Sequence, residues 1–490
     1  MGKGVIYYDV LGVPRDASPE EIRGAFFDAA KRLHPDANPD PTAREAFLIV
    51  QEAYEVLINP QKRSVYDSFL PQSQVATSVA VNLKYSRSKL PCLDEAQLVY
   101  VLLELICTAE PTQTNSPPMN ICLVIDRSTS MKGERMDMVK ANIAHLIRQL
   151  KPKDYLSVVA YSDRAVVVVP TTTVVDPHRL EHEVSLISTE GGTEMLQGLE
   201  AGISQLRAIR SKDIIRHLIL LTDGHTYGDE EACLEIAQRA AQDGITISAM
   251  GIGHEWNDAF LDKMTGLCGG NALFASSPED LFKYMEQKLT TIEKVYAKGV
   301  TFKFQNDERI QPRFIFRLYP EIAPLPTTSP ICLGNLLYGR SLTVLFEFLV
   351  QKIKQPVDKL HLASGYLEMD VINQGGVLQF LDIHRPTFED PEPELPPAPI
   401  VEAMSRLTLY RLQEKARLEV GQGETVEASK HLQYLATHLL SNGNRELAHT
   451  VLMEAEHIRQ SQRFSKDGDK RIKYGTRALL LPSGLERKKL

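Results

Sequence analysis

Two hydrophobic patterns divide the chain into helical and strand-like regions. Near the start, apolar residues recur every three or four positions, which predicts amphipathic helices over about 19–33 and 42–58. Strand-like runs occupy 79–85, 98–107, 299–304, 314–319, 341–350, 360–371 and 377–383. The two runs before residue 110 are too few to fold independently. We therefore expect both groups of strands to form one β-sandwich.

Between the two groups of strands, short apolar runs alternate with amphipathic segments. The expected strands are 121–125, 156–161, 214–221 and 245–251, and the expected helices are 134–150, 193–210, 230–243 and 278–292. This alternation predicts a doubly wound α/β domain. Since strand-like runs precede and follow it, we expect this domain to be inserted in the β-sandwich.

The last part of the chain follows an acidic, proline-rich linker at 391–399. Three helices are expected there, over 401–420, 425–441 and 444–461, with Gly443 placed to end the second. Residues 465–490 contain eight basic and three acidic residues. They predict a mobile basic tail, which either contacts acidic partners or is merely solvated.

These patterns define a multidomain chain. Its expected parts are an all-α domain (1–70), a linker (71–75), a β-sandwich formed from both flanks (76–112 with 296–388), the inserted α/β domain (118–293), a proline-rich linker (389–400), a helical hairpin or three-helix domain (401–464) and the basic tail (465–490). The length of 490 residues agrees with several domains, since one core seldom serves more than about 250–300 residues.

Composition narrows the classes of function. The chain is 43% hydrophobic and 24% charged, which is ordinary for a globular protein. Its net charge of −8 argues against a general nucleic-acid binder. The six cysteines are scattered singly, which disfavours a disulfide framework and a zinc site. No apolar run approaches about 18 residues and the start is not a signal peptide, so we expect a soluble, cytoplasmic protein without a membrane span.

The first two helices flank a short polar turn. Ser18-Pro19-Glu20-Glu21 is a capping box with proline at the first helical position, so it starts the first helix. Pro35 keeps His34 out of helical geometry, and His34-Pro35-Asp36 must follow this helix as a turn. We therefore expect two antiparallel helices that expose a His34-Pro35-Asp36 loop.

These helices and their turn resemble a DnaJ-type J-domain. The matching segments are Tyr8-Asp9-Val10-Leu11-Gly12-Val13, His34-Pro35-Asp36, Ala53-Tyr54-Glu55-Val56-Leu57 and Gln61-Lys62-Arg63-Ser64-Val65-Tyr66-Asp67. The resemblance implies stimulation of the ATPase of a DnaK-class 70-kDa heat-shock chaperone. It assigns this role to His34, Pro35 and Asp36 and to the basic face of the preceding helix, for which the candidates are Arg23, Lys31 and Arg32.

The segment departs from the J-domain family in its charge and in the sequence after it. Gly24 and Asp28 lie in a helix where the family is usually more basic and lacks glycine, and glycine weakens a helix by about 1 kcal/mol. Residues 1–70 contain eight Lys and Arg against eleven Asp and Glu, a net charge of −3. The glycine/phenylalanine-rich linker and cysteine repeats of fuller DnaJ proteins are absent, so client binding must reside elsewhere in the chain.

A polar cluster follows the first strand of the expected α/β domain. Asp126, Ser128 and Ser130 lie on one turn at the carboxyl end of that strand, where ligands bind in open α/β sheets. Thr193 follows two glycines on a later loop, and Asp223 follows another apolar strand. All five side chains offer oxygen atoms, which suits a hard divalent cation such as Mg²⁺.

Together, Asp126, Ser128, Ser130, Thr193 and Asp223 resemble the metal-ion-dependent adhesion site of a von Willebrand factor A (VWA) domain, and the resemblance extends over about 119–293. It implies that the hydroxyls bind the ion directly and that the aspartates act mostly through water. We expect Mg²⁺, with Mn²⁺ or Ca²⁺ as alternatives. Since two carboxylates barely neutralise a dication, an Asp or Glu of a partner can complete the site. The alternative is an unmetallated, hydrogen-bonded turn.

Other polar residues have weaker assignments. His217, His225 and His254 lack a metal-ligand spacing, so we assign them rim or structural roles. Within the basic tail, Lys473-Tyr474-Gly475-Thr476-Arg477 resembles the tails of some bacterial VWA proteins.

Three hypotheses on function remain. The first is a co-chaperone adapter that captures a client protein through Mg²⁺ and recruits a DnaK-class chaperone. The second is a metal-dependent interaction scaffold whose J-domain is weak or only docks. The third, a hydrolase, is disfavoured because the hydroxyl ligands lack a neighbouring general base and the chain contains no Gly-x-Ser-x-Gly or P-loop motif. We therefore expect no enzymatic activity.

Overall fold

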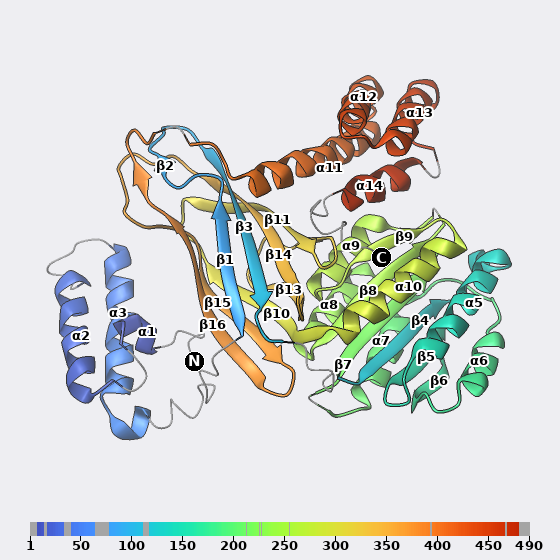
Figure 1. Cartoon of the computed structure of the whole chain (residues 1–490), viewed down its shortest axis with the longest axis horizontal. Coiled ribbons are helices and arrows are strands. Elements are labelled where there is room, and N and C mark those ends of the chain that lie inside the picture. Colours follow the sequence, from blue (N-terminus) through green and yellow to red (C-terminus); the bar gives the residue numbers. More distant parts are fainter. Residues whose placement is uncertain are drawn as a thin grey trace. The chain divides into compact units, whose positions relative to one another are not determined.

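A computed structural model describes residues 7–13, 17–33, 41–63, 78–110, 117–211, 213–224, 226, 228–253, 255–392, 394–465 and 468–479. The chain forms two compact units, Met1–Ala76 and Thr77–Leu490. Figure 1 labels most of the elements of both units. Their helices and strands confirm the multidomain fold class expected from the sequence.

The first unit is a small helical domain. Its helices are α1 (Tyr7–Leu11), α2 (Pro19–Leu33) and α3 (Pro41–Leu57). The capping box is confirmed, because the Ser18 N–H donates to Glu21 Oε2 at 2.7 Å and the Glu21 N–H donates to Ser18 Oγ at 3.3 Å. The core contains Ile22 and Ala53, which are fully buried, and Phe26 of α2 stacks on Tyr54 of α3. Apolar positions on one face of each helix therefore hold this unit together.

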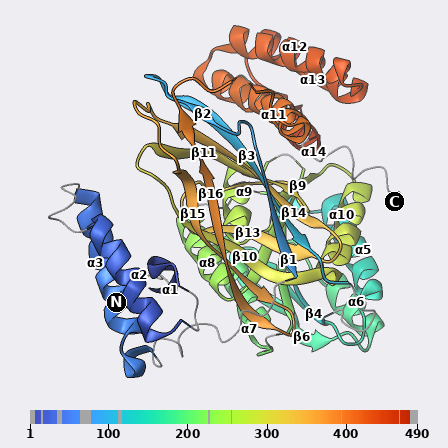
Figure 2. The same ribbon diagram turned by 60° about the vertical axis from the view of Figure 1, so that its left-hand side comes forward.

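A two-sheet β-sandwich begins the second unit (Figures 1 and 2). One sheet has the order β1-β3-β14-β11-β12 and the other β13-β10-β15-β16. The strands are β1 (Val79–Tyr85), β3 (Gln97–Cys107), β10 (Val295–Gln305), β11 (Ile310–Tyr319), β12 (Ala323–Leu325), β13 (Ile331–Leu337), β14 (Ser341–Val350), β15 (Leu360–Val371) and β16 (Gly375–Arg385). Two short strands, β2 (Leu90–Pro91) and β17 (Thr387–Phe388), pair in parallel.

The sandwich joins segments that are far apart in the sequence. β3 pairs with β14 in antiparallel register from Gln97 opposite Val350 to Ile106 opposite Ser341. A single hydrophobic core contains residues from both segments, including Val101 before the insertion and Phe346 after it. The prediction of one β-sandwich made from both flanks is thus confirmed.

The inserted α/β domain has a six-stranded sheet of order β6-β5-β4-β7-β8-β9. Its strands are β4 (Met119–Asp126), β5 (Tyr155–Tyr161), β6 (Ala165–Thr173), β7 (Ile215–Thr222), β8 (Ile245–Ile252) and β9 (Ala272–Ala275). All neighbouring strands are parallel except β6, which runs antiparallel to β5 at the sheet edge. The sequence pattern did not predict β6 or β9, because β6 is partly exposed and β9 has only four residues.

Helices cover both faces of this sheet, which makes it doubly wound. They are α5 (Glu134–Gln149), α6 (Pro177–Ser185), α7 (Met195–Arg207), α8 (Glu230–Gln242), α9 (Asp258–Leu267) and α10 (Pro278–Glu293). α5, α6 and α10 contribute to the core on one face, and α7, α8 and α9 to the core on the other. Neither α6 nor α9 was predicted, since both are short and carry many polar residues.

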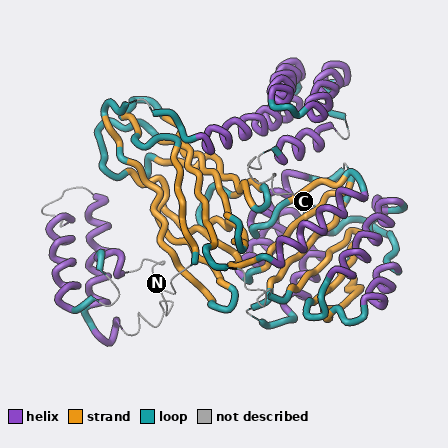
Figure 3. Tube along the Cα trace, in the orientation of Figure 1, coloured by secondary structure: helices purple, strands orange, loops and turns teal. Residues whose placement is uncertain are grey.

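The C-terminal part is a helical domain (Figure 3). Its helices are α11 (Ala398–Gln422), α12 (Thr425–Ser441), α13 (Arg445–Ser461) and α14 (Gly468–Ala478). α11 begins within the expected proline-rich linker, because proline is tolerated in the first turn of a helix. Gly443 has a φ of 80° after the end of α12, which confirms its expected role. Among the described residues, no helix is both long and apolar enough to cross a bilayer.

The prediction of a mobile basic tail over 465–490 is wrong for residues 468–478, which form α14. Lys473 and Arg477 are 2% and 1% exposed, although lysine and arginine are seldom buried without partners. Their partners are Asp258 and Asp262 of α9, two carboxylates that the sequence analysis did not single out. A Cβ on Gly475 would lie 2.7 Å from a Leu447 methyl, so α14 also packs closely on α13.

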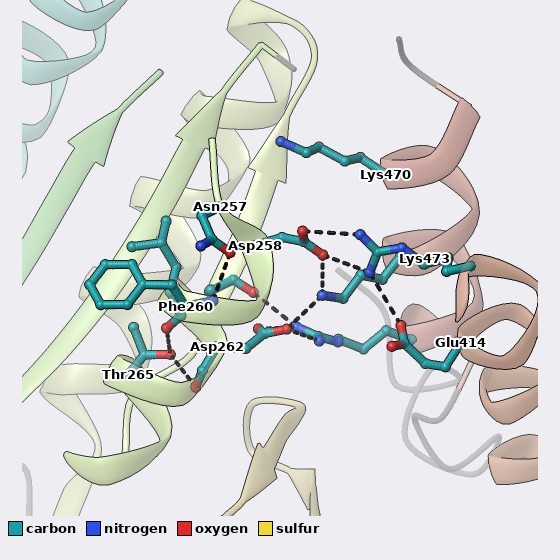
Figure 4. Close-up of polar contacts among 12 residues, drawn as sticks. Asn257, Asp258, Phe260, Asp262, Thr265, Glu414, Lys470 and Lys473 are labelled. Carbon is teal, nitrogen blue, oxygen red and sulfur yellow. Dashed lines mark hydrogen bonds and ion pairs between the residues drawn. The ribbon is translucent and has the colours of Figure 1, made fainter. Parts of the chain in front are cut away.

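The contacts between α9 and α14 form a buried network of charges, drawn in Figure 4. Lys473 lies between Asp258, with which it pairs, and Asp262, whose Oδ2 is 2.9 Å from its Nζ. Arg477 binds Asp262 through two bonds of 2.5 and 2.7 Å. Arg417 of α11 adds bonds of 2.9 and 3.1 Å to Asp258. The C-terminal helices are thus fixed to the α/β domain by charge-assisted hydrogen bonds.

We expect Arg477→Ala to destabilise the second unit by about 3 kcal/mol, because the substitution leaves Asp262 buried with an incomplete set of partners. Trp256 is the only tryptophan and precedes α9, so its fluorescence reports unfolding at this contact. Denaturant unfolding followed by this signal measures the loss. Arg459→Ala is the matched control, since Arg459 is 59% exposed in its side chain and should cost less than about 0.5 kcal/mol. Equal effects of the two substitutions would contradict this role of the network.

The same network predicts a dependence of stability on pH. Burial alone raises the pKa of Asp262, but the charges of Arg477 and Lys473 outweigh it and hold this pKa below its usual range. Because an unfolded aspartate titrates near about 3.9, this contribution to stability is complete well above pH 4 and is lost as the pH falls toward the folded pKa. The free energy of unfolding should therefore fall more steeply below pH 4 in the natural chain than in Asp262→Asn. Parallel curves would disprove the assignment.

Candidate metal centre

β4 places the first residues of the candidate site. All eight of its residues are buried between β5 and β7, as expected for a strand inside a sheet covered on both faces. The strand ends at Asp126, which has no exposed surface, and a single 3₁₀ turn, Thr129–Met131, follows. The apolar strand thus fixes a carboxylate at the carboxyl edge of the sheet, where loops converge.

Two hydrogen bonds orient the Asp126 carboxylate. Its Oδ1 accepts from the Ser128 N–H at 2.9 Å, and its Oδ2 accepts from the Thr222 hydroxyl at 2.8 Å. Burial raises the pKa of Asp126, although these hydrogen bonds act in the opposite direction. The carboxylate is therefore held in a fixed position at a cost that a bound cation would offset.

The hydroxyls and the second carboxylate lie next to it. The Oγ atoms of Ser128 and Ser130 are 2.9 Å apart, and the Ser130 hydroxyl donates to Asp223 Oδ1 at 2.7 Å. Asp223 directly follows β7 and has no exposed surface. Since β4 and β7 are parallel neighbours, their carboxyl ends bring Asp126 and Asp223 to the same edge.

Thr193 reaches this cluster from a separate loop. A Cβ built on Gly224 would lie 3.5 Å from Thr193 Oγ1 and 3.9 Å from Asp126 Oδ2, so both oxygens approach the same glycine. The loop is fixed by the Gly192 N–H, which donates to Asp163 at 2.8 Å. Gly191 has a φ of 73°, and a Cβ there would lie 2.5 Å from Asp163 Oδ2, so the loop requires glycine. The structure thus brings all five predicted residues together.

Arg135 of α5 is a member of the cluster that the sequence analysis missed. Its guanidinium pairs with Asp223 and also donates to the Ser130 carbonyl at 3.2 Å. The only available signal was a basic residue one turn after the serines, which is an ordinary surface feature of a helix. Its side chain is 36% exposed, so it has room to move away from Asp223.

The donor set fits a hard divalent cation. It consists of three hydroxyls and two carboxylates, all oxygen donors. The cluster contains two carboxylates and one guanidinium, which pairs with Asp223, so one negative charge is uncompensated if both carboxylates are ionised. Among the described residues, no group of three or more His, Cys, Asp or Glu side chains is arranged to hold a metal, so any such site depends on hydroxyls.

The remaining predicted site residues do not belong to this cluster. His34, Pro35 and Asp36 lie outside the described residues, as does the side chain of Arg32, whereas Arg23 and Lys31 are exposed on α2. His217 is buried, and its Nε2 is 3.1 Å from Ser248 Oγ. Burial lowers the pKa of His217, in agreement with the structural role expected for it. His225 and His254 lie outside the described residues.

Comparison with protein families finds three domains in this chain. A DnaJ domain matches residues 6–67, and a von Willebrand factor type A domain matches 120–298. The Sll0103-like, C-terminal alpha-helical domain matches 398–482, which includes α14. The chain therefore carries a DnaJ domain and a VWA domain, followed by a helical domain of the Sll0103-like type. This confirms both resemblances drawn from the sequence.

Individual relatives cover separate parts of the chain. Uncharacterized protein sll0103 of Synechocystis sp. is 31% identical over 179 residues, 36% of this chain and 42% of that protein. Chaperone protein DnaJ 2 of Streptomyces avermitilis is 59% identical over 61 residues, 12% of this chain and 16% of that protein. The chain thus spans less than half the length of these relatives.

Two solved structures share the fold of the second unit. A von Willebrand factor type A protein from Catenulispora acidiphila covers 81% of this chain and 96% of its own length, with a TM-score of 0.64 and 17% identity. The ArnB paralog VWA2 from Sulfolobus acidocaldarius covers 83% of this chain and all of its own, with a TM-score of 0.51 and 14% identity. At these identities the similarity concerns the fold alone.

Proposed function

We propose that this protein is a J-domain co-chaperone that acts as an adapter in the cytoplasm. Its DnaJ domain stimulates the ATPase of a DnaK-class chaperone, and its VWA domain binds a client or partner protein through Mg²⁺. The observation that carries the proposal is the presence, in one chain, of a DnaJ domain and of a VWA domain with five convergent oxygen donors. DnaJ and VWA domains are non-enzymatic in general, so the proposal assigns binding and not turnover.

The chaperone contact is assigned to α2 and the turn after it. His34, Pro35 and Asp36 are the segment by which the resemblance implies ATPase stimulation. Arg23 and Lys31 are eight residues apart on α2, both exposed, and lie on one side of the helix because its period is about 3.6 residues. They supply the positive charge with which the acidic surface of a partner would pair.

The client contact is assigned to the metal centre. Ser128, Ser130 and Thr193 would hold the ion directly, with Asp126 and Asp223 in support. A bound dication supplies an electrophile for a carboxylate of the partner. Arg135 pairs with Asp223, so its guanidinium must give up part of this contact when the ion binds.

A second candidate, a metal-dependent scaffold with a docking-only J-domain, is supported by the charge of α2. Asp28 is exposed on the helix that carries Arg23 and Lys31, and Gly24 is exposed beside them. A carboxylate on this face opposes binding to an acidic partner surface. The two candidates differ in whether contact with the chaperone accelerates ATP hydrolysis.

We expect the full chain to raise the steady-state ATPase rate of the DnaK of the same organism several-fold, and His34→Gln to abolish the increase. His178→Gln is the matched control, because it makes the same change at an exposed site on α6. Lys31→Glu should also weaken stimulation, whereas Lys62→Glu, an exposed charge reversal outside α2, should not. Binding to DnaK without stimulation would favour the scaffold. Stimulation that survives in His34→Gln would refute the adapter.

We further expect the full chain to bind one Mg²⁺ in isothermal titration calorimetry. Ser128→Ala removes a direct ligand and should weaken binding at least tenfold, about 1.4 kcal/mol. Thr129→Ala is the control on the same turn, because the Thr129 hydroxyl faces the Gly191 carbonyl at 3.4 Å and none of the five predicted ligands. Arg135→Gln should strengthen binding, since it removes a competing positive charge. Equal affinities of the two alanine variants would contradict this assignment.

A further inference from the structure

A groove opens between the edge strand β6 and the end of α6. Its volume is about 280 Å³, close to the lower end of pockets that hold small ligands, about 300 Å³. The walls are mostly apolar and include Val166 and Val168 of β6 and Leu186 and Ile187 after α6. A space of this size and lining accommodates one large aliphatic or aromatic side chain.

The groove borders the turn that carries two of the predicted metal ligands. Arg127, which lines it, stands between Asp126 and Ser128 in the sequence. The Arg127 carbonyl accepts from the Glu190 N–H at 2.8 Å, and the Arg127 side chain pairs with the Glu190 carboxylate at 2.5 Å. The segment that forms one wall of the groove thus continues directly into the loop that carries Thr193.

The groove exposes two apolar side chains and contains one buried polar atom that has no hydrogen-bond partner among the described residues. Leu186 is 68% exposed and Val166 is 49% exposed, although both line the same hollow. The Nε of Arg127 is buried and has no hydrogen-bond partner among the described residues. Exposed apolar side chains that gather around a concave site are typical of an interaction surface.

Charge restricts the occupant. Glu183 lines the groove, and Glu190 lies at the Arg127 end of it. Both carboxylates are already paired, Glu183 with Arg179 and Glu190 with Arg127, so a charged side chain placed in the groove would find no free partner, whereas an apolar side chain needs none. The metal centre, in contrast, has a net positive charge once a dication is bound, because the dication and Arg135 together outweigh the charges of Asp126 and Asp223.

We propose that this groove receives a large aliphatic side chain of the same partner segment whose Asp or Glu completes the metal centre. The inference rests on the proposed metal-dependent function. It specifies which partner segments the metal centre would recognise. The recognised element is then an acidic residue close to a Leu, Ile or Met. Burial of such a side chain adds to the affinity and, unlike the carboxylate contact, does not depend on the metal.

The test is selection from a phage-displayed library of random peptides, with the full chain immobilised in Mg²⁺ and elution by EDTA. Three forms of the chain are compared: the natural sequence, Val166→Asp and Val167→Asp. Val167 is the matched control, because it is 37% exposed on the same strand and adjacent strand residues face opposite sides of a sheet. Both substitutions are at exposed edge positions, and circular dichroism verifies that each variant folds.

We expect EDTA-eluted peptides from the natural chain to carry an Asp or Glu accompanied by a large aliphatic residue. Val167→Asp should select the same peptides, whereas Val166→Asp should select acidic peptides without the aliphatic preference and bind the original ones at least tenfold more weakly. Acidic peptides without an aliphatic preference from the natural chain would overturn the groove proposal and leave the metal function standing. A lack of EDTA-dependent peptides would overturn both.

Discussion

Complete burial of β4 is the constraint on which the functional part of this protein depends. Eight consecutive buried residues place the strand at the centre of the α/β sheet, between β5 and β7. The chain must then leave the sheet at Asp126, and the parallel neighbour β7 must deliver Asp223 to the same edge. Burying a cluster of polar oxygen atoms is unfavourable by itself. The hydrophobic burial along the strands offsets this cost.

A second constraint connects the C-terminal helices to the α/β domain. Lys473 and Arg477 of α14 are buried against Asp258 and Asp262 of α9, so removal of either side would leave charges without partners. The loop before α9 is part of the same contact, because Lys470 donates to the Trp256 carbonyl at 2.7 Å and lies over its ring. Burial lowers the pKa of Lys470 to about 8. The helical domain is thus an integral part of the second unit.

The sequence predicted those features that depend on regular periodicity or on local chemistry. The capping box at Ser18, the strand that ends at Asp126 and the pairing of two strand groups into one sandwich all follow from such patterns. The five oxygen donors were found because each follows a recognisable strand or glycine turn. Their convergence in the structure agrees with that assignment, while the identity of the ion stays a prediction.

Features that depend on tertiary partners were not predictable in the same way. Residues 468–478 have a basic composition typical of a solvated tail, and the buried carboxylates of α9 explain why their lysine and arginine side chains are buried in α14. In the sequence, Arg135 is an ordinary helix residue. Its role becomes visible only in the structure, where β7 places Asp223 next to it. The groove beside Arg127 likewise requires β6 and the end of α6, which the hydrophobic pattern did not indicate.

The central claim is that the five oxygen donors form a metal centre able to accept a carboxylate. A crystal of the full chain grown with Mn²⁺ tests it most directly, because the ion is located by its anomalous scattering. We expect one peak about 2.0–2.3 Å from the hydroxyl oxygens of Ser128, Ser130 and Thr193, with Arg135 withdrawn from Asp223. A map without a peak at this site, with the Arg135 to Asp223 pair intact, would contradict it.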